Sequence, residues 1–139
     1  MFLTVDSSVI VAALRKQEEK HHACMALMER IVEGEHIAVM PCTILVEVVS
    51  AIRRRTGDGN LAGRIGRDLE NIDTLYFLDV NKFRAKEASE IARTSGLRGM
   101  DALVVQAAKE HGAALVTLDT ELSAAARTMI KVSSAEDVH

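Results

Sequence analysis

Short apolar runs alternate along this chain with longer segments whose apolar residues recur at helical spacing. Brief uncharged runs are typical of strands in a parallel sheet, because both faces of such a sheet are covered. The sequence predicts strands at residues 2–5, 37–40, 75–78, 114–118 and 130–132. Strands that alternate with helices predict an α/β fold, here a three-layer α/β/α sandwich around a mainly parallel central sheet of about five strands.

Capping residues mark several helix boundaries. Pro41 suits the first turn of a helix, where a missing N–H is tolerated, and Gly57 suits the end of the same helix. Asn81 is a candidate N-cap for a later helix that Gly96 ends. This later helix is predicted at residues 82–94, and the other predicted helices cover residues 8–16, 21–32, 60–72, 100–111 and 120–129.

Length and composition indicate one globular domain. A chain of 139 residues with 48% hydrophobic and 27% charged residues is long enough to bury one core. Its longest uncharged apolar run, residues 37–46, is about half the length of a bilayer-spanning helix, and its first residues do not resemble a signal peptide. Cys24 and Cys42 alone do not make a disulfide scaffold. We therefore expect a cytoplasmic protein without a membrane span.

Four carboxylates stand out by their position. Asp6 directly follows the first predicted strand, and Asp119 follows the fourth. Open α/β sheets bind ligands at the carboxyl ends of their strands, so both acids lie where a site is expected. Glu47 and Asp101 are each surrounded by aliphatic residues. Taken singly, the three aspartates are also explained as helix caps or first-turn acids, and Glu47 as part of a solvated helix stripe.

Considered together, the four acids resemble the PIN-domain family over essentially the whole chain. In that family an Asp after the first strand is followed two places later by Asn, Ser or Thr, as Asp6 is followed by Ser8. A Glu in the helix after the second strand corresponds to Glu47. Many family members have Asn at the position of Ser8.

The second half of the chain continues the resemblance. An Asp that opens a helix in the family corresponds to Asp101, and the last family acid follows the fourth strand in a Thr-x-Asp context, as in Thr117 to Asp119. The position two places further, sometimes acidic in the family, is Glu121. The resemblance implies that Ser8, Thr117 and Glu121 are auxiliary to the site.

The resemblance implies an endoribonuclease whose catalytic and metal-holding residues are Asp6, Glu47, Asp101 and Asp119. A single small domain of this kind is most similar to the VapC-type toxins of toxin–antitoxin systems. This implies an RNA substrate, a homodimer, and a cognate antitoxin protein whose C-terminal segment covers the acidic site.

Simple electrostatics explains why such a site needs a cation. Two carboxylates about 4 Å apart repel by about 4 kcal/mol at an effective dielectric constant of about 20. Oxygen ligands without Cys or His at ligand spacing favour Mg²⁺ or Mn²⁺. A hard divalent ion lowers the pKa of bound water and neutralises charge on phosphate oxygens, which is the chemistry of phosphodiester hydrolysis.

Nucleic-acid binding has to rest on local basic clusters. With 17 Lys and Arg against 20 Asp and Glu, the net charge of −3 gives no general attraction for a polyanion. Arg53, Arg54 and Arg55 follow Glu47 on one predicted helix, with Arg54 on a similar face. We predict that these three arginines and Arg98 contact RNA phosphates, although each alone also fits a solvated surface.

Three alternatives involve other classes of protein or site. A receiver-like regulatory domain is suggested by Asp79 after the third strand, but Asp6 is followed by serines and not by a second acid. A PIN-fold protein that only binds RNA or protein would not need four mutually repelling acids. A zinc site at His21, His22 and Cys24 lacks a second ligand pair.

Overall fold

The five strands form one sheet in which every neighbouring pair is parallel. The computed structural model describes all residues, 1–139. The strands are β1 (Phe2–Val5), β2 (Ile37–Pro41), β3 (Leu75–Leu78), β4 (Ala114–Val116) and β5 (Val132–Ser133). Their order across the sheet is β3-β2-β1-β4-β5. This order and direction confirm the predicted parallel α/β sheet.

The strand order creates a switch point between β1 and β4. The chain adds β2 and β3 on one side of β1, then returns to add β4 and β5 on the other side. In open α/β folds, the carboxyl ends of two strands at such a point border a crevice that binds ligands. The residues that follow Val5 and Val116 therefore lie where this fold is expected to place a site.

Seven helices accompany the sheet. They are α1 (Ser7–Leu14), α2 (His21–Val32), α3 (Thr43–Thr56), α4 (Gly59–Glu70), α5 (Lys82–Ser95), α6 (Gly99–His111) and α7 (Thr120–Ala126). None of them combines the length and the apolar character that a membrane span requires.

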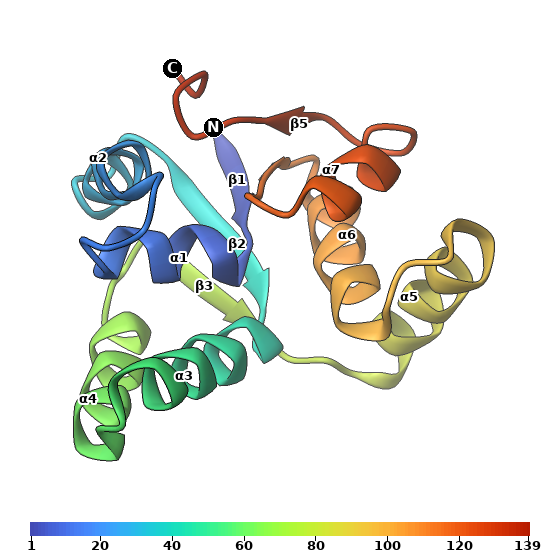
Figure 1. The fold of residues 1–139 in the computed structure, drawn as a ribbon. Helices are drawn as coiled ribbons and strands as arrows, with labels where there is room; N and C mark the ends of the chain where they lie inside the picture. Colours follow the sequence, from blue (N-terminus) through green and yellow to red (C-terminus); the bar gives the residue numbers. More distant parts are fainter.

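The helices cover both faces of the sheet, which confirms the three-layer architecture. Figure 1 shows α1 to α4 on one side of the sheet and α5 to α7 on the other. The helix α6 packs on β1, β2 and β4, and α5 packs on α6.

Pro41 ends β2 and does not begin a helix, so the sequence prediction was wrong at this residue. Pro41 pairs with Leu78 of β3, and the next N–H, that of Cys42, donates to the Leu78 carbonyl at 2.8 Å. A proline at the last residue of a strand removes a single donor at the end of the ladder. The helix α3 therefore begins two residues later, at Thr43.

Other element boundaries near the switch point also differ from the prediction. The strand β4 ends at Val116 and not at residue 118, because the Thr117 hydroxyl and the Leu118 N–H bond to Asp6 and Ser8. Further differences are α1 at Ser7–Leu14 for 8–16, α4 at Gly59–Glu70 for 60–72, α7 at Thr120–Ala126 for 120–129, and β5 at Val132–Ser133 for 130–132. The elements β2, α5 and α6 differ from the prediction by a single residue.

The helix α6 is anchored in the core along its length. Ala102, Val104, Val105 and Ala108 are fully buried, and the residues between them are almost fully buried. Burying an aliphatic side chain stabilises the fold by about 1.5–3 kcal/mol, so this helix is held firmly against the sheet. Asp101 precedes the buried run directly, and its backbone position is fixed with it.

An ion pair fastens α5 to α6. The guanidinium of Arg84 donates to both carboxylate oxygens of Glu110, at 3.1 and 3.0 Å, and the Gln106 amide donates to the same carboxylate at 2.8 Å. Hydrogen bonds from Arg84 and then from Gln106 lower the pKa of Glu110 from 4.5 to about 2. The charged form of Glu110 therefore stabilises the folded state.

We expect Glu110→Gln to lower the free energy of unfolding by about 1 kcal/mol at pH 7, given the partial solvent screening of this pair. A carboxyl group whose pKa falls on folding stabilises the protein above its unfolded pKa. That contribution is lost as the pH falls from 4.5 towards 2. Urea unfolding at neutral and acidic pH measures the change, with the exposed Glu87→Gln on α5 as control. An equal difference between variant and wild type at both pH values would contradict this assignment.

Candidate active site

Asp6 lies at the carboxyl end of β1 and is held by two hydroxyl groups. Its side chain is buried, and its N–H donates to the Val116 carbonyl at 3.0 Å, which ties the end of β1 to β4. The hydroxyls of Ser8 and Thr117 each donate to Oδ2 of Asp6 at 2.8 Å. Oδ1 is left without a hydrogen bond and is free to contact a ligand.

Backbone N–H groups orient both hydroxyls. The Ser8 Oγ accepts from the Leu118 N–H at 3.1 Å, and the Thr117 Oγ1 accepts from the Asp119 N–H at 3.0 Å. An ionised carboxylate only accepts hydrogen bonds, so each hydroxyl directs its proton to Asp6. The loop after β4 thus sets the orientation of the carboxylate that follows β1.

Glu47 projects from α3 towards the same acids and has no hydrogen-bond or ion-pair partner. Burial raises the pKa of Glu47, and the negative charges of Asp6 and Asp101 raise it further. Arg98 opposes these effects and lowers the pKa. The Glu47 carboxyl therefore lies within electrostatic range of Asp6 and Asp101.

Asp101 lies in the first turn of α6. Burial is the main cause that raises the pKa of Asp101, followed by the charge of Asp6; Asp119 also raises it. Arg98 lowers this pKa through its charge and a hydrogen bond. The interpretation of Asp101 as a first-turn acid is confirmed. It does not conflict with a role in a site, because the charges of Asp6 and Asp119 also act on this carboxyl.

Asp119 uses its two carboxylate oxygens differently. Oδ1 accepts from the N–H groups of Glu121 and Leu122 at 2.9 and 3.1 Å, so Asp119 caps α7 as the sequence suggests. Oδ2 faces Arg98 at 3.6 Å. Asp6, by contrast, precedes α1 without a side-chain capping bond. The capping interpretation is therefore correct for Asp119 and wrong for the side chain of Asp6.

Arg98 is the one cation that forms an ion pair with any of the four acids, namely Asp101 and Asp119. Its guanidinium lies 3.5 Å from Asp101 and 3.6 Å from Asp119, and its side chain is 79% exposed. A pair this exposed contributes little to stability because water screens it. Arg98 therefore compensates only part of the negative charge and remains accessible to an anionic ligand.

A hollow of about 630 Å³ opens beside Glu47, and of the four acids only Glu47 lines it; Ser7 and Ser8, which follow Asp6, also contribute to its wall. A polar stripe of α3, formed by Thr43, Glu47, Ser50 and Arg54, lines one wall. The sequence alone favours a solvated helix face for this stripe, whereas in the structure it borders a concave site. The hydroxyl of Thr43 is buried there without a hydrogen-bond partner, and sequence reasoning did not single it out.

The three consecutive arginines of α3 point to different surroundings. Arg54 lines the hollow and has no ion-pair partner, while Arg55 lines it but pairs with Glu18 at 2.9 Å. Arg53 lies against Gly59 at the start of α4 and does not line the hollow. Of the three, Arg54 has the geometry expected for contact with an anionic ligand.

Apolar side chains at the rim are a feature that the sequence did not indicate. Val46, Met100 and Leu118 are 68%, 46% and 36% exposed, and all three line the hollow. Each of these apolar residues directly precedes one of the acids in the sequence, and that position could have identified them as rim residues.

Glu121 has an exposed side chain without a hydrogen bond or ion pair, and only its N–H contacts Asp119.

The four acids suit a hard divalent cation in their chemistry. They offer only carboxylate oxygens, the ligands that Mg²⁺ and Mn²⁺ prefer. No three His, Cys, Asp or Glu side chains converge on one point at ligand distance. Because Mg²⁺ keeps several waters and needs only about one or two direct carboxylates, these residues fit such an ion without a closed protein cage.

Comparisons with known proteins point to one family. The family model described as "PIN domain" matches residues 3–128. A search of curated proteins finds no match. The structure is similar to VapC20 of Mycobacterium tuberculosis, described as a sarcin–ricin loop cleaving toxin, with a TM-score of 0.74 and 18% identity over 90% of this chain and 95% of that chain.

Two further structures share the fold. FitAcB of Neisseria gonorrhoeae has a TM-score of 0.69 and 21% identity over 99% of this chain and 100% of that chain. VapBC2 of Rickettsia felis, bound to a DNA fragment from its promoter, has a TM-score of 0.67 and 15% identity over 96% and 98%. These likenesses at low identity establish the fold alone.

Proposed function

Since the chain belongs to the PIN domain family, we propose that it is a divalent-metal-dependent endoribonuclease and the toxin of a toxin–antitoxin pair. The observation that carries the proposal is the gathering of four carboxylates at the β1–β4 switch point, where burial and mutual repulsion raise the pKa of Glu47 and Asp101. Gathering acids whose charges repel one another costs folding free energy, so the stability of the fold alone does not explain why these four lie together.

Asp6, Glu47, Asp101 and Asp119 would hold the metal ion. When bound, a Mg²⁺ or Mn²⁺ ion supplies an activated water and neutralises charge on the phosphate that is attacked. Ser8 and Thr117 fix the carboxylate of Asp6 and leave its Oδ1 free. Glu47 and Asp101 hold protons more readily than free carboxyl groups, so cation binding competes with protonation and weakens at acidic pH.

An anionic substrate has to approach this acidic centre past basic side chains. Arg54 in the hollow and the exposed Arg98 offer guanidinium groups for phosphate oxygens. RNA as the substrate is supported by the structural likeness to a toxin described as cleaving the sarcin–ricin loop. The rim of Val46, Met100 and Leu118 suits apolar contact with an unstacked base.

We also propose a cognate antitoxin and a homodimer as partners. The structural relatives FitAcB and VapBC2 support a toxin–antitoxin assembly. An apolar groove of about 280 Å³ between α1, α2 and α4, with Leu14, Met25 and Val32 exposed, supports a protein partner because such patches are typical of interfaces.

The test of the nuclease is metal-dependent cleavage by the purified chain. We expect cleavage of a pool of structured RNAs with Mg²⁺ or Mn²⁺, no cleavage with EDTA, and restored cleavage after the metal is added back. A DNA pool of the same sequences is the substrate control. Cleavage that persists in EDTA would contradict the metal assignment. Absence of cleavage by a folded chain that still binds RNA would favour a PIN-fold binding protein.

A further inference from the structure

A second hollow lies on the β4–β5 side of the acids. It has a volume of about 380 Å³ and is lined mainly by polar residues of the loop after β4, of α7 and of the segment at β5. Ser123 and Arg127 contribute from α7 and its C-cap, and Ser133 and Ser134 contribute from the end of β5. The sequence alone indicates no function for any of these four residues.

This second hollow borders the candidate active site. Thr117, Leu118 and Asp119 line it, and Thr117 donates to Asp6. Leu118 also lines the hollow beside Glu47, so this side chain lies between the two hollows. A strand that crosses the acids from the α3 side and passes Leu118 would enter the β4–β5 hollow.

The lining offers hydrogen-bond donors that the fold does not use. Arg127 is exposed, and its guanidinium makes no ion pair or hydrogen bond. The Ser123 hydroxyl also makes none, and the Ser133 hydroxyl makes only a long bond of 3.3 Å to the Ser134 carbonyl. The one carboxylate in the lining, Asp119, is already directed to α7 and Arg98.

We propose that the β4–β5 hollow is a subsite for the sugar–phosphate backbone of the nucleic acid, next to the bond that is cleaved. A guanidinium among hydroxyl groups is suited to phosphate and ribose oxygens, and it contributes affinity without reading base sequence. This inference rests on the proposed nuclease function and extends it, because it adds Arg127 and Ser123 to the substrate path. An acidic peptide is the other occupant that this chemistry allows.

The experiment measures binding without catalysis. A fluorescein-labelled single-stranded RNA of mixed sequence is titrated with the full chain in EDTA, and anisotropy gives the Kd between about 50 and about 200 mM KCl. We expect Arg127→Gln to weaken binding about fivefold at the lowest salt and to reduce the slope of log Kd against log salt by about 0.7, the value for one lost phosphate contact on a single strand. Ser123→Ala should weaken binding about two- to threefold, as for one lost hydrogen bond.

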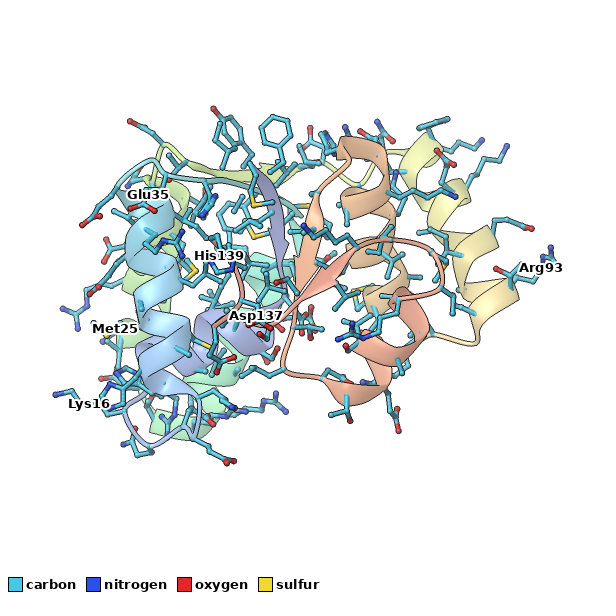
Figure 2. All side chains as sticks on the ribbon, turned by 90° about the horizontal axis from the view of Figure 1, so that it is seen from above. Lys16, Met25, Glu35, Arg93, Asp137 and His139 are labelled. Carbon is cyan, nitrogen blue, oxygen red and sulfur yellow. The ribbon has the colours of Figure 1, made fainter.

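The matched control is Arg93→Gln, which removes the same charge from α5. Figure 2 shows Arg93 at the outer end of α5, on the opposite side of the molecule from Met25 and Glu35. Its only ion pair, with Glu90, is fully exposed, so its loss is expected to leave folding and RNA affinity unchanged. An equal loss of affinity in this control would attribute the effect of Arg127 to net charge and overturn the proposal.

The variant Arg54→Gln separates the proposed subsite in the β4–β5 hollow from the proposed RNA binding at the acidic centre. If Arg54→Gln weakens RNA binding and Arg127→Gln does not, the subsite is wrong while RNA binding at the acidic centre stands. If the wild-type chain does not bind the RNA in this assay, both proposals fail. If Arg127→Gln leaves RNA binding unchanged but weakens binding of a labelled poly-glutamate peptide, the hollow binds an acidic peptide, and the backbone assignment is overturned.

Discussion

Asp101→Asn is expected to reduce metal-dependent RNA cleavage by more than about a hundredfold while leaving the fold intact, because we propose Asp101 as a direct metal ligand, and such ligands matter at least as much as the groups that orient them. The substitution keeps the shape of the side chain and removes one negative charge from the acidic centre. Since burial and the neighbouring acids raise the pKa of Asp101, its charged form costs folding free energy at neutral pH. The variant should therefore be at least as stable as the wild type.

Two measurements on the same protein separate a lost function from a lost fold. Initial cleavage rates with saturating Mn²⁺ report activity, and thermal unfolding at pH 7 reports stability. Asp73→Asn, at an exposed aspartate outside the site, is the matched control and should behave as wild type in both. Full activity of a folded Asp101→Asn protein would remove this residue from the catalytic centre, and a large drop in its stability would show that Asp101 has a structural role.

The sheet could be predicted because its strands are buried on both faces. Leu3, Ala38 and Leu115 are fully buried, and such positions leave a run without charges that is readable in the sequence. Boundaries were less predictable where a residue type suits two environments. Pro41 is tolerated both in the first turn of a helix and at the end of a strand, and only its pairing with Leu78 decides between them.

The candidate acids could be identified from their order along the chain, but the residues that hydrogen-bond to them could not. Ser8 and Thr117 are separated by more than a hundred residues in sequence, and both donate to the same oxygen of Asp6. That arrangement depends on β4 lying beside β1, a neighbour relation that alternating strands and helices do not specify. The sequence also could not show which of the consecutive arginines of α3 faces the hollow. Only the packing of α3 on α4 turns Arg53 away from it.

Thr117→Val should raise the Mn²⁺ concentration needed for half-maximal cleavage by about 10- to 100-fold, the range for loss of a group that orients a metal ligand. Valine keeps the shape of threonine but removes the hydroxyl that donates to Asp6 Oδ2 and accepts from the Asp119 N–H. Asp6 then keeps the Ser8 hydroxyl alone, and its carboxylate is free to rotate away from the other acids.

Metal activation curves with an RNA substrate distinguish this positioning role from a structural one. We expect the maximal rate at saturating Mn²⁺ to change much less than the half-maximal concentration, and Thr117→Ser to restore the wild-type curve because it returns the hydroxyl. Thr94→Val is the matched control, since the Thr94 hydroxyl bonds only to carbonyls of its own helix, α5. An unchanged metal requirement in a folded Thr117→Val protein would show that Ser8 and the backbone suffice to hold Asp6, and that the loop after β4 does not control the site through this hydroxyl.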